Sequence, residues 1–338
     1  MRLSSSLARN VIETLRGGVF NKFRIKRRRD ALFFEDILAE YLKECEREGY
    51  AEEIEKNNYD SFAMLIDNLL PGAMRSLPPG LIFNNVLRDV WVNIGLIDDM
   101  HADIRGDKVV FRMKNECITR LIGANRYSVG GIAGLIKSIF RCEVKSISVK
   151  KLGENEWEYE FLLERGKYRP VKVKDYADYE RLNRLKESGG VNLKRAMGAG
   201  VFRIEQNRIF FRSMPLWHVE SVFLHTLGNL GLCKGALPRI AYSKFKNVVE
   251  KGSSAKERLV LLKTLLESMG WGTVQINFRD KNNIAIEIRE PPYGIQAEPE
   301  NWSMFLLTIL GYLWTINKKL RLKKTVVGER LLRATYAE

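Results

Sequence analysis

The chain has 338 residues, of which 45% are hydrophobic and 29% charged, a globular composition that excludes a mainly disordered protein. Its 56 Lys and Arg against 41 Asp and Glu give a net charge of +15, which favours an anionic partner such as nucleic acid or an acidic membrane surface. The four cysteines form no Cys-x-x-Cys pair, so neither a disulfide framework nor a zinc ribbon is predicted, and a cytoplasmic location is expected.

An internal duplication organises the chain. Asn10–Phe20 and Asn192–Phe202 share a pattern in which a helical turn ends at glycine and Val-Phe follows. The first 18 residues have no apolar core of the length that a secretory signal needs. An apolar-periodic helix is predicted after each repeated string, over Leu32–Glu48 and Leu216–Leu230. Two further helices are expected in each half, at Tyr59–Leu70 and Leu81–Val92 and at Pro238–Glu250 and Ala255–Met269.

The later part of each half predicts two β-hairpins separated by an apolar helix. Leu96–Met113 and Thr273–Ile288 each alternate apolar and polar residues on either side of a polar turn. The apolar helices are predicted at Tyr127–Phe140 and Trp302–Ile316, and the second hairpins at Glu143–Glu164 and Leu320–Tyr336. The uncharged Trp302–Ile316 stretch is shorter than the roughly 20 residues of a spanning helix, so no membrane span is expected.

The predicted fold class is therefore α+β, as two tandem copies of a helical layer packed on a four-stranded antiparallel sheet. A polar, charged segment over residues 165–190 is expected to be a helical connector between the copies. This places the first domain at residues 1–164 and the second at residues 191–338.

The order of these elements resembles a known family. A Met-Gly-Trp-Gly turn at residues 269–272, an Ile-rich hairpin and Gly311 in the next helix are similar to the vinyl-4-reductase domain. That small-molecule-binding domain is related to the Bet-type subunits of the transport protein particle. The first copy repeats the pattern with Gly130, Gly131 and Gly134 at the start of its apolar helix.

The resemblance implies a pocket between helices and sheet for a hydrophobic or aromatic small molecule. It also implies dimerisation through helices, which tandem copies would satisfy as an intramolecular pseudo-dimer, and a homodimer stays open. The family's cysteines, which have been interpreted as metal or redox ligands, have no counterpart here. No metal site and no cofactor are therefore predicted.

Aromatic residues and glycines of the two apolar helices are the candidates for lining such a pocket. Close helix packing explains the glycines, and core packing the rings, without any ligand. The candidates are Tyr127, Gly131, Gly134 and Phe140 in the first copy, and Trp302, Phe305, Gly311 and Tyr312 in the second.

Basic residues supply the candidates for binding nucleic acid or another anion. One cluster lies near the N-terminus, and another is expected to form an outward stripe on a strand. A solvated surface that protects an edge strand is the alternative explanation. The candidates are Arg24, Lys26, Arg27, Arg28 and Arg29 in the first cluster, and Lys319, Arg321 and Lys323 in the stripe.

No motif for nucleophilic catalysis or for a P-loop occurs in the chain. Asp99, His101 and Asp103 alternate along a predicted strand, and His218 and His225 share a predicted helix face, but both sets are interpreted as ordinary surface or core residues. No catalytic residue is proposed, and whether the protein is an enzyme stays open. The expected function is non-enzymatic binding of a hydrophobic or aromatic small molecule, or scaffolding; the alternative is nucleic-acid binding by the basic clusters.

Overall fold

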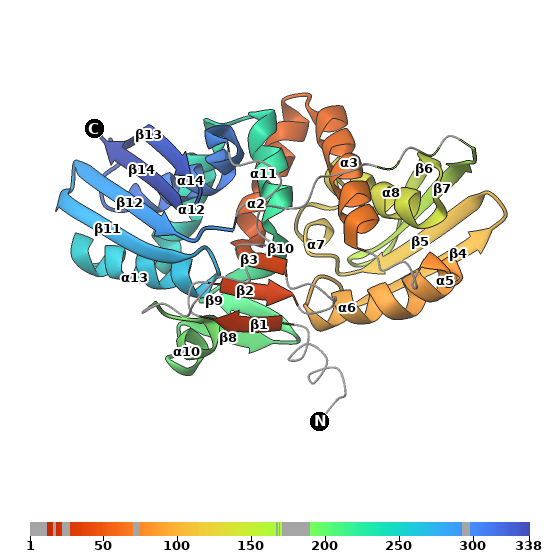
Figure 1. Cartoon of the computed structure of the whole chain (residues 1–338), viewed down its shortest axis with the longest axis horizontal. Coiled ribbons are helices and arrows are strands. Elements are labelled where there is room, and N and C mark those ends of the chain that lie inside the picture. The colour runs from red at the N-terminus through yellow and green to blue at the C-terminus, as the bar shows by residue number, and fades with distance from the viewer. Residues whose placement is uncertain are drawn as a thin grey trace. The chain divides into compact units, whose positions relative to one another are not determined.

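The structure, a computed structural model, describes residues 12–15, 18–21, 28–69, 75–166, 168, 170, 190–292 and 298–338. The chain divides into two compact units (Figure 1). As far as they are described, unit 1 comprises Leu38–Lys174 and Gln206–Arg208, and unit 2 comprises Asn10–Ile37, Asp175–Glu205 and Ile209–Glu338. Helices and antiparallel sheets make up both units, which confirms the predicted α+β class.

Unit 1 contains a four-stranded antiparallel sheet with the order β4-β5-β7-β6. Its strands are β4 (Asp99–Arg105), β5 (Lys108–Lys114), β6 (Glu143–Gly153) and β7 (Glu156–Glu164). The helices are α2 (Glu35–Arg47), within which the division between units falls, α3 (Ala51–Leu69), α5 (Pro79–Leu81), the π-helical η1 (Ile82–Leu87), α6 (Arg88–Asn93), α7 (Thr119–Ile122) and α8 (Arg126–Phe140). Phe111 and Phe161 point from the sheet into a core that α8 covers with residues such as Leu135 and Ile136.

Unit 2 contains a second four-stranded sheet, with the order β11-β12-β14-β13. Its strands are β11 (Thr273–Asp280), β12 (Asn283–Arg289), β13 (Arg321–Gly328) and β14 (Leu331–Ala337). The helices of this unit are α10 (Leu193–Gly198), α11 (Ser221–Leu230), α12 (Ala236–Val248), α13 (Ala255–Ser268), the 3-10 helix η2 (Pro299–Trp302) and α14 (Ser303–Leu313). In chain order both sheets run first, second, fourth, third, and all four hairpins lie where alternation and turn residues predict them.

A six-stranded sheet in unit 2 was not expected from the sequence. Its order is β1 (Ile12–Leu15), β2 (Gly18–Asn21), β3 (Arg28–Phe34), β10 (Met214–Glu220), β9 (Arg208–Phe211) and β8 (Phe202–Glu205). The central strands β3 and β10 pair antiparallel, with Leu32 opposite His218. Because each of these two residues lies three positions before the helix that follows its strand, a local two-fold axis passes through this pair.

This sheet corrects two predicted helices. The helices α2 and α11 begin only at Glu35 and Ser221, and the preceding residues, which the prediction included in helices at Leu32–Glu48 and Leu216–Leu230, form β3 and β10. Residues 31–34 and 216–219 are buried on both strand faces. A short continuous apolar run of this kind has no alternation, so its periodicity does not separate a strand from a helix.

The two similar segments Asn10–Phe20 and Asn192–Phe202 differ in structure. Asn192 caps α10 by accepting a hydrogen bond from the Arg195 N–H at 2.8 Å, so the helical turn predicted there is confirmed. Its N-terminal counterpart forms strands β1 and β2 instead. The sequence analysis placed residues 12–34 in the first domain, but the three strands within this range belong to unit 2. Most of the predicted connector at residues 165–190 lies outside the described residues.

Within the described ranges, no helix combines the length and apolar character that crossing a bilayer requires. The apolar segment that raised the question forms η2 and α14, and α14 has 11 residues. Its residues Phe305, Ile309 and Leu313 are almost fully buried in unit 2. Burial inside the unit explains the apolar character of the segment.

Candidate functional site

An aromatic-lined cavity in the core of unit 2 is the candidate site. Its volume is about 20 Å³, room for one water molecule, and its walls come from β3, α12, α13, the turn after α13, and α14. Its aromatic lining residues are Phe33, Phe34, Phe245, Trp271, Phe305 and Tyr312. The remaining walls are aliphatic or Met side chains and Thr308.

The rings around the cavity contact one another directly. Trp271 stacks on Phe305 with ring centroids 4.1 Å apart, and Phe245 makes edge contacts at 5.0 Å with both Phe34 and Tyr312. Offset and edge-on pairs of this kind stabilise a core beyond the area they bury. The cavity is therefore bounded by mutually supporting rings.

Strand β3 reaches the cavity through two hydrogen bonds to the turn after α13. The Leu32 N–H donates to the Met269 carbonyl at 2.8 Å, and the Trp271 indole N–H donates to the Leu32 carbonyl at 3.0 Å. Gly272 follows with φ of +115°, and a Cβ there would lie 2.5 Å from the Arg289 carbonyl oxygen. Glycine is thus required for this turn to present Trp271 to the core.

The polar groups in the cavity wall already have partners. The Tyr312 hydroxyl donates to the Arg258 carbonyl at 2.8 Å, and the Thr308 hydroxyl donates to the Met304 carbonyl at 2.8 Å. Burial also raises the pKa of Tyr312, so its hydroxyl stays protonated. A molecule held here would meet apolar surface and aromatic faces.

The second-copy pocket candidates gather around this cavity, but not all of them line it. Phe305 and Tyr312 do. Trp302 lies one layer behind, fully buried, with its ring 6.0 Å from Phe305 and 4.6 Å from the His225 ring. Gly311 packs against α12, where a Cβ would lie 2.4 Å from Ala241 Cβ.

In the first copy the candidates lie in packed regions of unit 1. A Cβ on Gly134 would come within 2.2 Å of the Tyr59 carbonyl oxygen, and one on Gly131 within 2.8 Å of the Asn58 side chain. Phe140 stacks on Phe83 with centroids 6.2 Å apart, and Tyr127 is buried. For Gly134 and Gly311, close helix packing is the explanation that the geometry supports.

Of the N-terminal basic cluster, the structure describes the side chain of Arg29 alone. Arg24, Lys26 and Arg27 lie outside the described residues, and Arg28 is described only as backbone of β3. Arg29 is 6% exposed, and its guanidinium donates to the carbonyls of Gly270, at 3.3 Å, and Glu290. Its position in the unit 2 core corrects its assignment as a surface anion contact.

The predicted basic stripe over residues 319–323 is also corrected. Lys319 precedes β13 and forms an ion pair with Glu338 at 2.7 Å. A register shift between Leu322 and Lys324 places Lys323 at a bulge, so Lys324 follows Arg321 on the outward face. Arg321 donates to the carbonyls of Lys318 and Leu320 at 3.0 and 2.9 Å, and its guanidinium lies 5.8 Å from the Trp314 ring centre.

Among the described residues, no group of three or more His, Cys, Asp or Glu side chains is placed to hold a metal ion. Asp99 accepts a hydrogen bond from Arg88 at 2.6 Å, and Arg105 holds the pKa of Asp103 below its usual value. His218 and His225 are buried, and burial lowers their pKa values to about 4 and about 3. The His225 imidazole is therefore a neutral core group, whereas the buried Asp30 carboxylate lies 3.3 Å from His218 Nε2 and favours the protonated form of that imidazole.

Comparison of the chain with family models and with curated proteins gives no match. The resemblance to the vinyl-4-reductase domain therefore remains a prediction. The residue that sequence reasoning missed most clearly is Phe33, because it lines the cavity from a strand more than 200 positions before the other walls. The hydrogen bonds of Leu32 to Met269 and Trp271, which no local sequence signal predicts, hold Phe33 at the cavity.

Proposed function

We propose that unit 2 binds a hydrophobic small molecule, with an aromatic or branched apolar body, in the cavity lined by Phe33, Phe245, Trp271, Phe305 and Tyr312. The observation that carries the proposal is an apolar cavity between helices and strands whose polar wall groups already have partners. A molecule the size of benzene occupies a cavity of roughly 150 Å³. Binding therefore requires the rings to move apart from the roughly 20 Å³ arrangement.

The first test compares the intact mass of the purified protein under native and denaturing conditions, after a high-salt wash. A mass excess that disappears on denaturation supports the proposal and gives the mass of the ligand. Equal masses for protein from its natural source, together with no thermal shift on addition of benzene or indole to the wild type, would overturn it.

A variant pair locates the site. Phe305→Ala removes a ring from the cavity wall, and we expect benzene to raise the Tm of this variant more than that of the wild type. Phe211→Ala is the matched control, because it deletes an equally buried ring that does not line the cavity. Each substitution costs about 3–5 kcal/mol of stability. Equal benzene shifts in both variants would mean that any new void in unit 2 binds the probe, against the proposal.

We also infer that the duplication serves as an intramolecular pseudo-dimer in the cytoplasm. The two-fold pairing of β3 with β10, which joins a strand from each half of the chain, supports the pseudo-dimer. The four free cysteines support a reducing compartment. Light scattering that gives the mass of a single chain at micromolar concentration is the expected result, and a stable homodimer would contradict it.

A further inference from the structure

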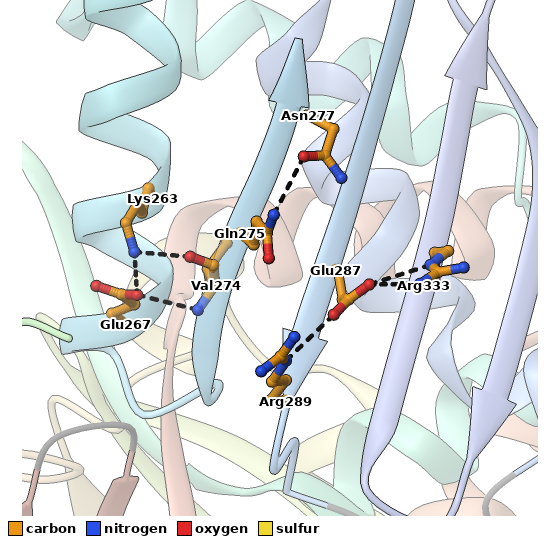
Figure 2. A network of polar contacts seen from close by, with 8 residues as sticks. All are labelled: Lys263, Glu267, Val274, Gln275, Asn277, Glu287, Arg289 and Arg333. Carbon is orange, nitrogen blue, oxygen red and sulfur yellow. Dashed lines mark hydrogen bonds and ion pairs between the residues drawn. The ribbon is translucent and has the colours of Figure 1, made fainter. Parts of the chain in front are cut away.

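The four-stranded sheet of unit 2 presents one face away from its helices. Along β12 and β14, Ile286, Ile288 and Leu332 point inward and are almost fully buried, whereas Glu287, Arg289 and Arg333 alternate with them on the opposite face. We call this opposite face the outer face. Figure 2 shows its central side chains projecting from neighbouring strands.

The outer face is strongly basic. Strand pairing brings four basic side chains and one carboxylate to it from β12, β13 and β14. These residues are Arg289, Arg321, Lys324, Arg333 and Glu287. Arg289 and Arg333 have side-chain exposures of 67% and 53%, so both are open to a partner from solvent.

Glu287 orients the two central arginines. Its carboxylate accepts hydrogen bonds from Arg333 Nη2 at 2.6 Å and from Arg289 Nε at 3.2 Å (Figure 2). The two arginines lower the pKa of Glu287, so the carboxylate stays ionised and offsets one of their two charges. The remaining guanidinium N–H groups form a fixed, net positive donor array of the kind that binds phosphate in a bidentate manner.

The corresponding face in unit 1 is an internal comparison. The first, third and fifth residues of β7 are Glu156, Glu158 and Glu160, and Glu158 and Glu160 are ion-paired with Arg112 at 2.8 Å and Lys108 at 2.6 Å. The same positions of β14 hold Leu331, Arg333 and Thr335. Unit 2 therefore lacks all three carboxylates of this strand and has gained an arginine.

We propose that the outer face of the unit 2 sheet binds the phosphate backbone of nucleic acid. Charge complementarity to a polyanion and the guanidinium forks of Arg289 and Arg333 support this partner. Among the outward residues of β12, β13 and β14, Val326 is the exposed apolar side chain and Leu331 is half-buried, which is little apolar surface to insert into a lipid layer. Nucleic acid is thus favoured over an acidic membrane.

This site is separate from the proposed ligand cavity. Its residues point to the side of the sheet opposite to the inward residues Ile286 and Ile288, and none of them lines the cavity. Because it lacks exposed rings for base stacking, the face is expected to contact backbone phosphates with little sequence preference.

The test measures binding of a labelled 20-nucleotide single strand, and of its duplex, by fluorescence anisotropy over a series of salt concentrations. Each phosphate contact contributes about 0.7 to the slope of log affinity against log salt for a single strand. The variant Arg289→Gln/Arg333→Gln removes two contacts, so we expect an affinity about 25-fold lower at 0.1 M salt and a slope smaller by about 1.4. Glutamine keeps a hydrogen-bond donor for Glu287.

The matched control is Arg112→Gln/Lys114→Gln, which removes the same two charges from the outward side of the unit 1 sheet. We expect less than a two-fold change in affinity for this control. An equal loss of affinity in both double variants would mean that binding depends on the net charge of the protein and not on this face. That result would overturn the proposal. Lys324→Gln, which leaves the Glu287 contacts untouched, is expected to weaken binding about 5-fold and guards against misfolding of the double variant.

Two further outcomes would overturn the proposal. One is no binding of either oligonucleotide by the wild type at 25 mM salt, where phosphate contacts are strongest. The other is tight binding to phosphatidylserine vesicles that depends on Arg289 and Arg333 while oligonucleotide binding does not, which would assign the face to an acidic lipid surface. The mass measurement on the cavity is unaffected by these variants, so the two proposals fail separately.

Discussion

Gly134 is the position where a single methyl group tests the packing of unit 1 most directly. A Cβ at this residue would lie 2.2 Å from the Tyr59 carbonyl oxygen and 3.1 Å from the Ala63 nitrogen. Carbon and oxygen ordinarily approach to about 3.3 Å, so α3 and α8 must separate by about 1 Å to admit it. Overpacking costs about 1–3 kcal/mol or more, and alanine regains about 1 kcal/mol of helix propensity. We expect Gly134→Ala to lower the free energy of unfolding by about 2 kcal/mol.

Urea denaturation followed by circular dichroism measures this loss. Gly198→Ala is the control, because Gly198 is the last residue of α10 and a Cβ there meets nothing within 4 Å. We expect the control to be unchanged or more stable by up to about 1 kcal/mol. A Gly134→Ala protein as stable as the wild type would refute the close crossing of α3 and α8.

Three further predictions follow from buried or capping groups. Burial lowers the pKa of His225 to about 3 from its ordinary 6.5, so its contribution to stability is fully present above pH 6.5 and is lost as the pH falls. Between pH 7 and pH 5 we expect the wild type to lose about 2 kcal/mol of unfolding free energy that His225→Gln does not lose, as measured by urea titration at both pH values. Glu267 is 1% exposed and accepts hydrogen bonds from Lys263 and from the Val274 N–H at 3.0 Å (Figure 2), and from the Val191 N–H. We expect Glu267→Ala to lower the free energy of unfolding, measured in urea, by about 2 kcal/mol or more. A smaller loss would mean that water replaces the carboxylate. Ser254→Ala removes the side-chain oxygen of the α13 capping box and should lower the Tm by the equivalent of about 1 kcal/mol, with the exposed Ser243→Ala as control.

The hairpins and the apolar helices were predictable because their signals are local. In β12, Ile284, Ile286 and Ile288 alternate with smaller or polar residues, and Asn282 and Asn283 at the turn tolerate the tight backbone. In α8, Asn125 caps the helix by accepting a hydrogen bond from the Ser128 N–H at 2.8 Å. Each of these signals lies within about ten residues of the structure it predicts.

The six-stranded sheet was not predictable, because its defining contact is not local. Within the N-terminal segment alone, β3 would be an edge strand. It becomes central because β10, almost 200 residues later in the chain, pairs with it, with Leu32 opposite His218. The run Ala31–Phe34 is apolar at every position, so its sequence favours burial without favouring a strand or a helix. For the same reason the cavity could be assigned only in part, with Phe305 and Tyr312 found and Phe33 missed.

The prediction of the basic stripe at Lys319, Arg321 and Lys323 was wrong for a different physical reason. Strict alternation predicted that Lys319, Arg321 and Lys323 share one face, and alternation holds only while the ladder is regular. The bulge at Lys323 inserts one residue, which moves Lys324 onto the face that Arg321 occupies. The basic character of the strand was right, but the residues that present it to solvent follow from pairing that only the structure supplies.

The two four-stranded sheets share their strand order but differ in the charges on their outward faces. Arg112 is the fifth residue of β5 and pairs with Glu158, the third residue of β7; Glu287 is the fifth residue of β12 and pairs with Arg333, the third residue of β14. The same cross-strand ion pair therefore occurs in both sheets with its signs reversed. Reversal preserves the attraction between the strands but moves the arginine to the last strand, opposite Val326 of β13 and two residues along β14 from the partner of Lys324. The fold thus tolerates the exchange at little cost in stability, while the surface changes from balanced to basic, which is where we expect the two copies to differ in what they bind.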